Sequence, residues 1–432
     1  MARIAYSLAW WLALPAVLAR LWWRGRKEAG YRQHLAERFG CYAGAAPAGR
    51  KILWLHAVSV GETRAAEPLV EALLAAYPAH TILLTHMTPT GRATGRALFL
   101  KHGSRVLQSY LPYDTGWMAA RFLRHFSPQV CMLMETEVWP NLIAQCVAQR
   151  VPVALLNARL SARSLRRAER FGGLMREAAQ RLSCVAAQTP ADAQRLQQIG
   201  ARNVQVTGSI KFDVVPPAAA LALGESLRER IGVRPVLLCA STREGEEALI
   251  LDALQAAGAD ASSDDMLLLL VPRHPQRFDA VAQLVTARGL TMQRRSSLDA
   301  AMAGAPIAPA VQVLLGDSMG EMFAYYAACD VAFIGGSLLP LGGQNLIEAC
   351  TLGKPVLTGP HTFNFAAVTE DAIAAGAAQR VADAAALLRE AALLLSQPAQ
   401  RQPAGRAALA FAQQYRGATG RTLALLRALI PN

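Results

Sequence analysis

A glutamate in the stretch HAVSVGET (56–63) stands where an apolar strand gives way to a predicted helix. Lys51–Leu55 is typical of the end of a buried strand, and Glu62 follows Gly61, which can let the backbone turn tightly and approach a substrate closely. A carboxylate at such a point can remove the proton from a hydroxyl and act as a general base. A first-turn glutamate is also favoured by the helix dipole. The residue types leave both interpretations open.

Three further charged residues follow predicted strands. Glu135 and Glu137 in METEVWPN (134–141) lie two residues apart and point the same way if the chain is extended there. Lys211 in GSIKFD (208–213) could balance negative charge on a substrate or leaving group, or it is a solvated surface lysine. One glutamate could bind hydroxyl groups or orient Lys211 while the other caps a helix, and the sequence does not distinguish them.

Short apolar stretches alternate with Ala-, Leu- and Arg-rich stretches of helical spacing, which predicts parallel sheets covered by helices on both faces. The predicted strands are Lys51–Leu55, Thr81–Thr85, Val130–Met134, Val153–Leu156 and Cys184–Ala187, then Val236–Ala240, Met266–Val271, Val311–Leu315, Val331–Ile334 and Pro355–Leu357. The proline-containing break Val214–Ala220 separates the two series. We therefore predict an α/β protein with two Rossmann-like, doubly wound domains, 28–215 and 216–432. Ligands should bind beyond the carboxyl ends of the strands, in the cleft between the domains.

The predicted helices include Ala65–Tyr77 and Ser164–Leu182 in the first series, and Ala384–Leu395 and Arg406–Ile430 near the C-terminus.

The N-terminal 27 residues resemble an uncleaved membrane anchor. Ile4–Ala19 carries no charge, and Trp22 and Trp23 stand where a signal-peptide cleavage site would lie. A bilayer span needs about 20 residues, so both a spanning helix and one lying in the interface are compatible with the segment. Arg24, Arg26 and Lys27 predict that the chain after the anchor stays on the cytoplasmic side.

Composition narrows the class of protein. The 432 residues are 53% hydrophobic and 17% charged, which excludes a disordered chain, and the net charge of +13 predicts an anionic partner. The sequence has neither a basic tract interleaved with aromatic residues nor zinc-finger spacing, so a nucleic-acid partner is not expected. Seven scattered cysteines predict reduced thiols. No strand ends in Asp-X-Asp and no histidines are paired, so neither a metal nor a cofactor is expected.

Ten motifs occur along the chain in an order that resembles the Kdo transferase family. They are HAVSVGE, TPTG, YLPYD, ETEVWPN, NARLSARS, KFD, EGEE, PRHP, GDSMGE and GPHTFNF. The resemblance implies the two-domain GT-B fold, and a transfer of 3-deoxy-D-manno-octulosonic acid (Kdo) from CMP-Kdo to the lipid A precursor lipid IVA in lipopolysaccharide core biosynthesis. It implies inversion at the anomeric carbon, attachment to the inner face of the bacterial inner membrane, and no catalytic metal. Glu62 matches the family's catalytic base, and the last helix of GT-B proteins typically crosses back to the first domain.

The resemblance places CMP on the second domain. The residues implied are Pro272, Arg273, Met319, Gly320, Glu321, Gly336, Ser337, Asn345, Leu346, Ile347 and Glu348. An arginine fork suits a phosphate or a cytosine edge, and free backbone amides of the Gly-rich loop suit the phosphate. Glu348 could accept hydrogen bonds from the ribose hydroxyls. The Arg-rich segments 24–38 and 159–170 could attract the phosphorylated lipid acceptor, although either could be an ordinary solvated helix face.

The sequence departs from the family pattern at three positions in the second domain. Gln344 stands where histidine is usual, Leu346 where proline is usual, and Arg243 where histidine is common. These departures concern the geometry of nucleotide binding and leave Glu62 and Lys211 in place. Two alternatives are a GT-B transferase that uses a UDP-sugar, which would bind UDP and not CMP, and a membrane-tethered binding module, which needs no base.

Overall fold

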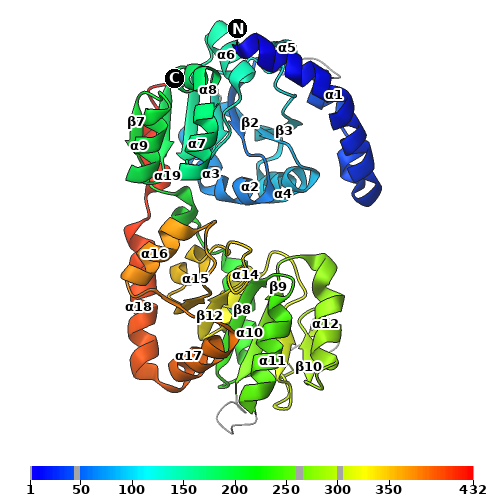
Figure 1. Ribbon diagram of the computed structural model, residues 1–432, viewed down its shortest axis with the longest axis vertical. Helices are drawn as coiled ribbons and strands as arrows, with labels where there is room; N and C mark the ends of the chain where they lie inside the picture. The colour runs from blue at the N-terminus through cyan, green and yellow to red at the C-terminus, as the bar shows by residue number, and fades with distance from the viewer. Residues whose placement is uncertain (1, 43–48, 171, 259–265, 299–304, 432) are drawn as a thin grey trace. The chain divides into compact units, whose positions relative to one another are not determined.

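The computed structural model describes residues 2–42, 49–170, 172–258, 266–298 and 305–431, and the chain divides into two compact units. The first unit comprises the chain up to Val214 together with the C-terminal segment from Arg416, and the second comprises Val215–Tyr415. Over the described residues, each unit is built on one seven-stranded parallel sheet with helices on both faces (Figure 1). The predicted doubly wound α/β fold class is confirmed.

The strand order of the first sheet is β3-β2-β1-β4-β5-β6-β7. Its strands are β1 (Lys51–His56), β2 (His80–His86), β3 (Val106–Tyr110), β4 (Val130–Met134), β5 (Val153–Ala158), β6 (Cys184–Ala187) and β7 (Val204–Val206). The α-helices are α1 (Ala2–Lys27), α2 (Val60–Ala65), α3 (Glu67–Ala76), α4 (Pro89–Phe99), α5 (Gly116–Phe126), α6 (Pro140–Ala148), α7 (Ala162–Arg170), α8 (Gly172–Gln180), α9 (Pro190–Gln198) and α19 (Ala418–Leu426). The short 3-10 helices are η1 (Ala29–Arg32), η2 (Leu35–Phe39), η3 (Leu100–Arg105) and η4 (Ile210–Asp213).

The strand order of the second sheet is β10-β11-β9-β8-β12-β13-β14. Its strands are β8 (Val236–Thr242), β9 (Leu267–Pro272), β10 (Met292–Arg294), β11 (Val313–Leu315), β12 (Val331–Ile334), β13 (Val356–Thr358) and β14 (Ala378–Arg380). The helices are α10 (Ala218–Ile231), α11 (Glu246–Gly258), η5 (Pro275–Arg277), α12 (Phe278–Thr286), α14 (Met322–Ala328), α15 (Ile347–Thr351), α16 (Ala366–Ala374), α17 (Ala384–Ser396) and α18 (Pro398–Gln414).

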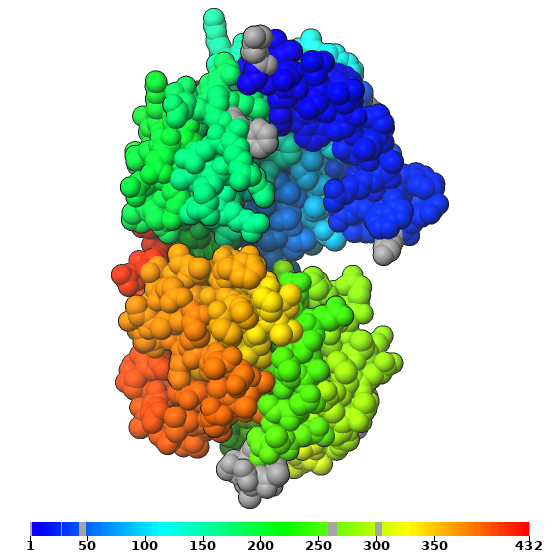
Figure 2. All heavy atoms as spheres, in the orientation of Figure 1, coloured from blue at the N-terminus to red at the C-terminus, as the bar shows by residue number. Residues whose placement is uncertain are grey.

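Helix α1 lies on the surface of the first unit, where it contacts α6 and α8 (dark blue in Figures 1 and 2). It is the one helix among the described residues that is long and apolar enough to cross a membrane by length and composition, over Ala2–Arg26.

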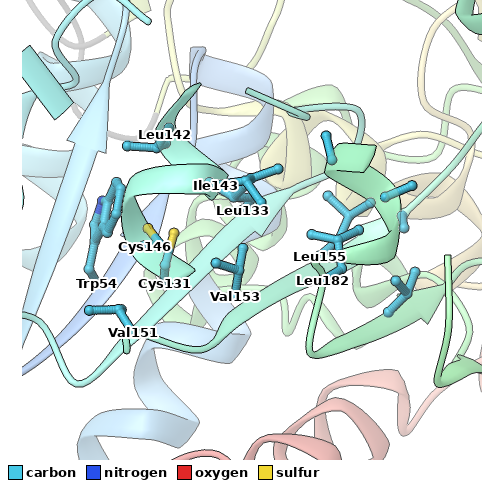
Figure 3. Packing of buried hydrophobic residues seen from close by; sticks show 14 of the residues in the cluster. Trp54, Cys131, Leu133, Leu142, Ile143, Cys146, Val151, Val153, Leu155 and Leu182 are labelled. Atoms are coloured by element: carbon cyan, nitrogen blue, oxygen red, sulfur yellow. The ribbon is translucent and has the colours of Figure 1, made fainter. Parts of the chain in front are cut away.

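The inner strands of the first sheet are mostly apolar because side chains on both faces of the sheet are buried. One cluster fills the face of the sheet beneath α5 and α6, and Figure 3 shows side chains of β4, β5 and α6 pointing toward one another. A second cluster, which includes Leu53 and Leu55, fills the opposite face. Strands of a parallel sheet are buried on both faces and are therefore apolar throughout rather than alternating. Trp54 is fully buried, and its indole N–H donates to Thr85 Oγ1 at 2.8 Å.

Several boundaries differ from the predictions. The sheet edges β3, β7, β10 and β14 were not predicted as strands. The predicted helix Arg406–Ile430 is two helices, α18 and α19, because the chain turns at Gly417 with a φ of +88°. The predicted helix Ser164–Leu182 is α7 and α8. The break predicted over Val214–Ala220 is shorter, since α10 begins at Ala218.

Candidate active site

Glu62, Glu135 and Glu137 lie at the point where the first sheet changes its winding direction. Strands β1 and β4 are neighbours in the sheet, but β2 and β3 lie on one side of them and β5 to β7 on the other. The connections that leave β1 and β4 therefore run to opposite sides, and doubly wound sheets bind ligands at such a switch point. Glu62 follows β1, and the other two glutamates follow β4.

The carboxylate of Glu62 reaches back over the start of α2. Its Oε2 accepts the backbone N–H of Val58 at 2.8 Å, and the Ser59 hydroxyl donates to Oε1 at 3.4 Å. Burial raises the pKa of Glu62 to about 7, against the lowering effect of the Val58 N–H, and Glu137 and Glu135 raise it further. Glu62 thus fixes the turn that leads into α2 and also has a pKa suited to a general base at neutral pH.

Gly61 does not make the tight turn that we predicted. It is the second residue of α2, its φ is not positive, and a Cβ built there would meet nothing within 4 Å. Gly61 is exposed beside the half-buried Glu62. The absent side chain therefore leaves open space on the surface of α2, although it does not bend the backbone.

Glu135 and Glu137 have different partners. Glu135 has a φ of +55°, so the chain is not extended there and the condition for the two side chains to point the same way is not met. The carboxylate of Glu135 lies 2.8 Å from Lys211 Nζ, in an ion pair whose side chains are only 14% and 22% exposed. Glu137 accepts the indole N–H of Trp139 at 2.9 Å, and burial raises its pKa. Of the two glutamates, Glu135 is the one that orients Lys211.

Two residues that the sequence analysis did not single out hold Lys211 in place. Asn157 at the end of β5 is fully buried with a φ of +50°, and its side-chain oxygen accepts the backbone N–H of Ile210 at 3.2 Å. Asp213 at the end of η4 accepts the backbone N–H groups of Gly417 and Thr419 at 2.6 and 2.5 Å. The signal for Asn157 was its residue type, because asparagine adopts the left-handed conformation more readily than most residues.

Two buried histidines lie at the ends of β1 and β2. Nδ1 of His56 lies 2.9 Å from Thr85 Oγ1, and Nδ1 of His86 lies 3.0 Å from the carbonyl oxygen of Ala57. Burial lowers the pKa of His56 to about 3 and that of His86 to about 4, so both are neutral. The described part of the chain holds no group of three His, Cys, Asp or Glu side chains placed to bind a metal ion.

The second sheet has its own switch point, between β8 and β12, and a buried glutamate joins the two loops there. Glu246, which begins α11, accepts the backbone N–H groups of Arg243, Gly336 and Leu338 at 2.8, 2.6 and 2.9 Å. The prediction that the amides of this Gly-rich loop are free is therefore wrong for Gly336 and Leu338. A protein carboxylate, rather than a ligand phosphate, binds them. The role of Glu246 was not predicted.

Ser337 is a structural residue of the same loop. It is fully buried, its hydroxyl donates to the carbonyl oxygen of Ile334 at 2.5 Å, and it accepts the N–H of Gly359 at 2.8 Å. A Cβ at Gly359 would lie 2.3 Å from the Ser337 carbonyl oxygen, so only glycine fits there. Ser337 therefore fixes the loop after β12 to the loop after β13.

Asn345 fixes the start of α15. Its side-chain oxygen accepts the N–H of Ile347 at 3.1 Å, and its amide donates to Glu348 Oε1 at 3.4 Å. Leu346 and Ile347 are buried, whereas Asn345 and Glu348 are only partly so. Leu346 and Ile347 therefore pack in the interior, whereas Asn345 and Glu348 lie closer to solvent.

The remaining predicted nucleotide residues follow β9 and β11. Pro272 is buried as the last residue of β9, and the exposed Arg273 donates its backbone N–H to Thr242 at 2.9 Å. Met319 is 61% exposed, and Gly320 has a φ of +87°. Glu321 is held by a buried arginine and a serine: Arg295 Nε lies 3.1 Å from its carboxylate, and the Ser318 hydroxyl donates to it at 2.6 Å. The loops that follow β9, β11 and β12 all lie at the carboxyl edge of the second sheet.

Comparison with known proteins gives full-length relatives. The chain is 49% identical to the 3-deoxy-D-manno-octulosonic acid transferase of Bordetella pertussis over 428 residues, which is 98% of each chain. It is 37% identical to the Haemophilus influenzae protein of the same name, over 98% of each chain. Residues 33–214 match the family described as 3-Deoxy-D-manno-octulosonic-acid transferase (kdotransferase). A solved UDP-GlcNAc 2-epimerase from Neisseria meningitidis, bound to UDP-GlcNAc, matches 88% of this chain and 100% of its own with a TM-score of 0.58 at 15% identity, which is a likeness of fold.

Proposed function

The chain belongs to the 3-deoxy-D-manno-octulosonic acid transferase family, and we propose that it moves Kdo from CMP-Kdo to the lipid A precursor lipid IVA with inversion at the anomeric carbon. Membership makes it a glycosyltransferase of lipopolysaccharide biosynthesis. The proposal assigns the acceptor to residues 28–215 and the donor nucleotide to residues 216–432. It requires no metal.

Glu62 is the general base of the proposed reaction. The acceptor hydroxyl forms a new C–O bond at the anomeric carbon of Kdo while its proton passes to the Glu62 carboxylate. The bond from that carbon to the phosphate oxygen of CMP breaks, and CMP departs with the electron pair. Attack opposite the leaving group inverts the configuration, through an oxocarbenium-like transition state. Glu62 is only partly buried, which supports access of a sugar hydroxyl to its carboxylate.

Lys211 supplies positive charge in this reaction. A cation fixed in a partly dry site stabilises negative charge more strongly than one in bulk water. Its partner Glu135 holds the ammonium group at 2.8 Å, and Asn157 and Asp213 position the backbone that carries it. We assign Lys211 to the carboxylate of Kdo or to the departing phosphate. Glu137 lies near Glu62 and raises its pKa, so it serves to tune the base or to bind acceptor hydroxyls.

In the second unit, we assign CMP to the loops that follow β9, β11 and β12. Arg273 offers the phosphate or the cytosine a guanidinium fork, Glu348 accepts from the ribose hydroxyls, and the turn Met319–Glu321 lies against the base. Glu246 and Ser337 do not touch the nucleotide in this assignment. They hold the Gly-rich loop in the shape that binds it.

One observation carries the proposal: a carboxylate with a pKa of about 7 lies at the switch point of the first sheet, and Glu135, which pairs with Lys211, is close enough to raise that pKa. The test is incubation of the purified protein with CMP-Kdo and lipid IVA, followed by mass measurement of the product and determination of its anomeric configuration. A mass increase of one or more Kdo units with inverted configuration is expected. Tight binding of UDP in place of CMP, or retained configuration, would overturn the donor assignment or the single-displacement mechanism respectively.

We place the enzyme at the cytoplasmic face of the bacterial inner membrane, held there by its N-terminal helix. Two features support this location: the apolar length of α1, and the basic residues Arg24 and Arg26 near its C-terminal end.

A further inference from the structure

Helix α1 has apolar side chains on two faces, and only one of them packs against the protein. The packed face consists of residues three or four apart: Ser7, Trp10, Leu14, Val17 and Leu21. Leu14 and Leu21 are buried there in a cluster with Tyr31, Tyr113 and Met118. The helix is therefore a component of the first unit rather than an appendage of it.

Polar contacts hold the same face along most of its length. The Ser7 hydroxyl donates to Asn141 Oδ1 at 3.2 Å, and the Trp10 ring stacks on Tyr113 with centroids 5.8 Å apart. Near the start of the helix, Arg3 lies 3.8 Å from the carboxylate of Glu177. These partners belong to α5, α6 and α8 or to the loop before α5, so the docking surface is polar as well as apolar.

This docking is incompatible with a helix that crosses the bilayer. A spanning helix is surrounded by hydrocarbon or by other membrane segments for about 20 residues. If α1 spanned while docked, the side chains of Asn141 and Glu177 would lie at membrane depth together with the ends of α6 and α8. Polar groups and helix ends placed in hydrocarbon lose their hydrogen bonds to water without replacement, so the docked helix cannot span.

The other face of α1 is an exposed apolar stripe, which we call the outer stripe. It consists of Ile4, Leu8, Trp11, Leu12, Leu18, Trp22 and Trp23, each between 40% and 83% exposed. Ile4, Leu8, Trp11, Leu18 and Trp22 follow one another at three, four or seven residues and so line up along the helix, and Leu12 and Trp23 widen the stripe on one side. A soluble surface rarely exposes so many large apolar side chains together, so the outer stripe points to an apolar partner.

Charge and shape at the end of α1 identify that partner as an anionic lipid surface. The guanidinium groups of Arg26 and Arg32 lie 4.4 and 5.1 Å from the centre of the Trp22 ring, and Arg24 is exposed nearby. Tryptophan and arginine together are typical of the headgroup region of a bilayer. A pocket of about 380 Å³ adjoins them, and its lining is almost wholly apolar: Leu18, Ala19, Leu21, Trp22, Tyr31, Arg32 and Leu35. Part of one acyl chain would fit it.

We propose that α1 lies flat in the interface of an anionic phospholipid bilayer, with its outer stripe among the acyl chains and its inner face docked on the first unit. The helix then holds the whole first unit at a fixed orientation to the membrane without crossing it. The proposal rests on the proposed function at one point: the acceptor is a lipid, and it reaches the enzyme from this membrane surface.

A reversible lock on the helix tests the proposal. The double variant Ser7→Cys/Asn141→Cys places two thiols where the native side chains are hydrogen-bonded, and oxidation fixes α1 to α6. Binding to vesicles of phosphatidylcholine and phosphatidylglycerol in a four-to-one ratio is measured by flotation, before and after oxidation. The locked protein is expected to bind within about twofold of the reduced protein, because interfacial binding does not require the helix to undock. Loss of vesicle binding on oxidation would overturn the proposal.

Labelling in cells gives an independent readout that does not depend on the disulfide. In the variant Ala2→Cys, a membrane-impermeant maleimide should label residue 2 in inverted membrane vesicles and not in intact spheroplasts, because a flat helix keeps its N-terminus on the cytoplasmic side. Labelling in intact spheroplasts would show that the helix crosses the membrane.

Substitutions on the outer stripe measure its contribution. Leu8→Glu/Leu12→Glu should lower the vesicle partition constant at least about tenfold, since two apolar side chains leave the acyl region and two charges oppose an anionic surface. Val233→Glu, at a 97% exposed apolar residue of the second unit, is the matched control and should leave the partition constant unchanged. Equal losses in both variants would contradict the assignment. Kdo transfer to detergent-dispersed lipid IVA is followed in parallel, so a failed membrane proposal is distinguished from a failed function.

Discussion

Replacing Glu62 by glutamine should abolish most of the activity and stabilise the protein at the same time. Glutamine keeps the shape of the side chain and an oxygen that accepts the Val58 N–H, so the start of α2 is preserved. It cannot accept a proton from the acceptor hydroxyl. General-base catalysis contributes about 100- to 10,000-fold in rate, and we expect kcat to fall by that factor.

The stabilisation follows from the sign of the pKa shift. Burial raises the pKa of Glu62 from 4.5 in an unfolded chain to about 7 in the folded protein. Between these pH values the folded state binds a proton that the unfolded state has released, so the carboxylate destabilises the fold increasingly as the pH rises through that window. At pH 8 the full shift corresponds to about 3 kcal/mol, and partial exposure reduces it, so we expect Glu62→Gln to gain about 1 to 3 kcal/mol there and almost nothing at pH 5.

Two measurements check this prediction, and one variant serves as the control. Thermal unfolding at pH 5 and pH 8 should show a rise in Tm of a few degrees for Glu62→Gln at the higher pH only. In the native enzyme, log kcat/KM should rise with a slope of one below pH 7 and then level off. Glu67→Gln removes a neighbouring carboxylate whose pKa is also raised by burial, and it should stabilise at high pH without loss of transfer. Transfer by Glu62→Gln within tenfold of the native rate would refute the role of the base.

Four further predictions concern the Lys211–Glu135 ion pair, Glu246, Gly359 and the removal of metal ions. Lys211→Met and Glu135→Gln should each reduce transfer and lower the free energy of unfolding in urea by roughly 1 to 3 kcal/mol, because each leaves one charge of the pair in a mostly buried site. The double variant should lose less than the sum of the two single losses. Glu246→Gln should destabilise the second unit by roughly 1 to 3 kcal/mol and weaken CMP binding in calorimetry without moving the pH profile assigned to Glu62, since three backbone N–H groups lose a buried carboxylate. Gly359→Ala should lower Tm and CMP affinity because its Cβ would collide with the Ser337 carbonyl oxygen, whereas Gly420→Ala, where a Cβ meets nothing within 4 Å, should leave both unchanged. Dialysis against EDTA should leave the rate of Kdo transfer unchanged, and a loss restored by one divalent cation would contradict the metal-independent mechanism.

The inner strands were predictable because burial on both faces makes them apolar at nearly every position. Val130–Met134 and Val331–Ile334 agree with the structure to the residue. The four strands that were missed, β3, β7, β10 and β14, are the outermost strands of the two sheets. An edge strand has one neighbour and a partly exposed surface, so its sequence carries a weaker apolar signal.

The sequence indicated which residues could form the site, but it did not show which of them contact one another. The loop after each strand identified Glu62 and Lys211 as candidates, but the sequence could not choose between Glu135 and Glu137 as the partner of the lysine. That choice depends on the left-handed backbone at Glu135, which redirects the side chain. Glu246 was missed for a related reason. The backbone N–H groups that donate to it lie some 90 residues further along the chain, and only the adjacency of β8 and β12 brings them together.

The return of the C-terminal segment to the first unit makes the second unit an insertion within the first. Residues 416–431 follow the second unit in the chain, and they include the amides that Asp213 binds and the helix α19, which packs on α3. The short helix that carries Lys211 thus lacks part of its support until the whole second unit has been translated. Cleavage of the folded protein near Tyr415 would separate the same contacts from the chain that leaves the second unit, and Lys211 would lose that support although none of the predicted site residues is removed.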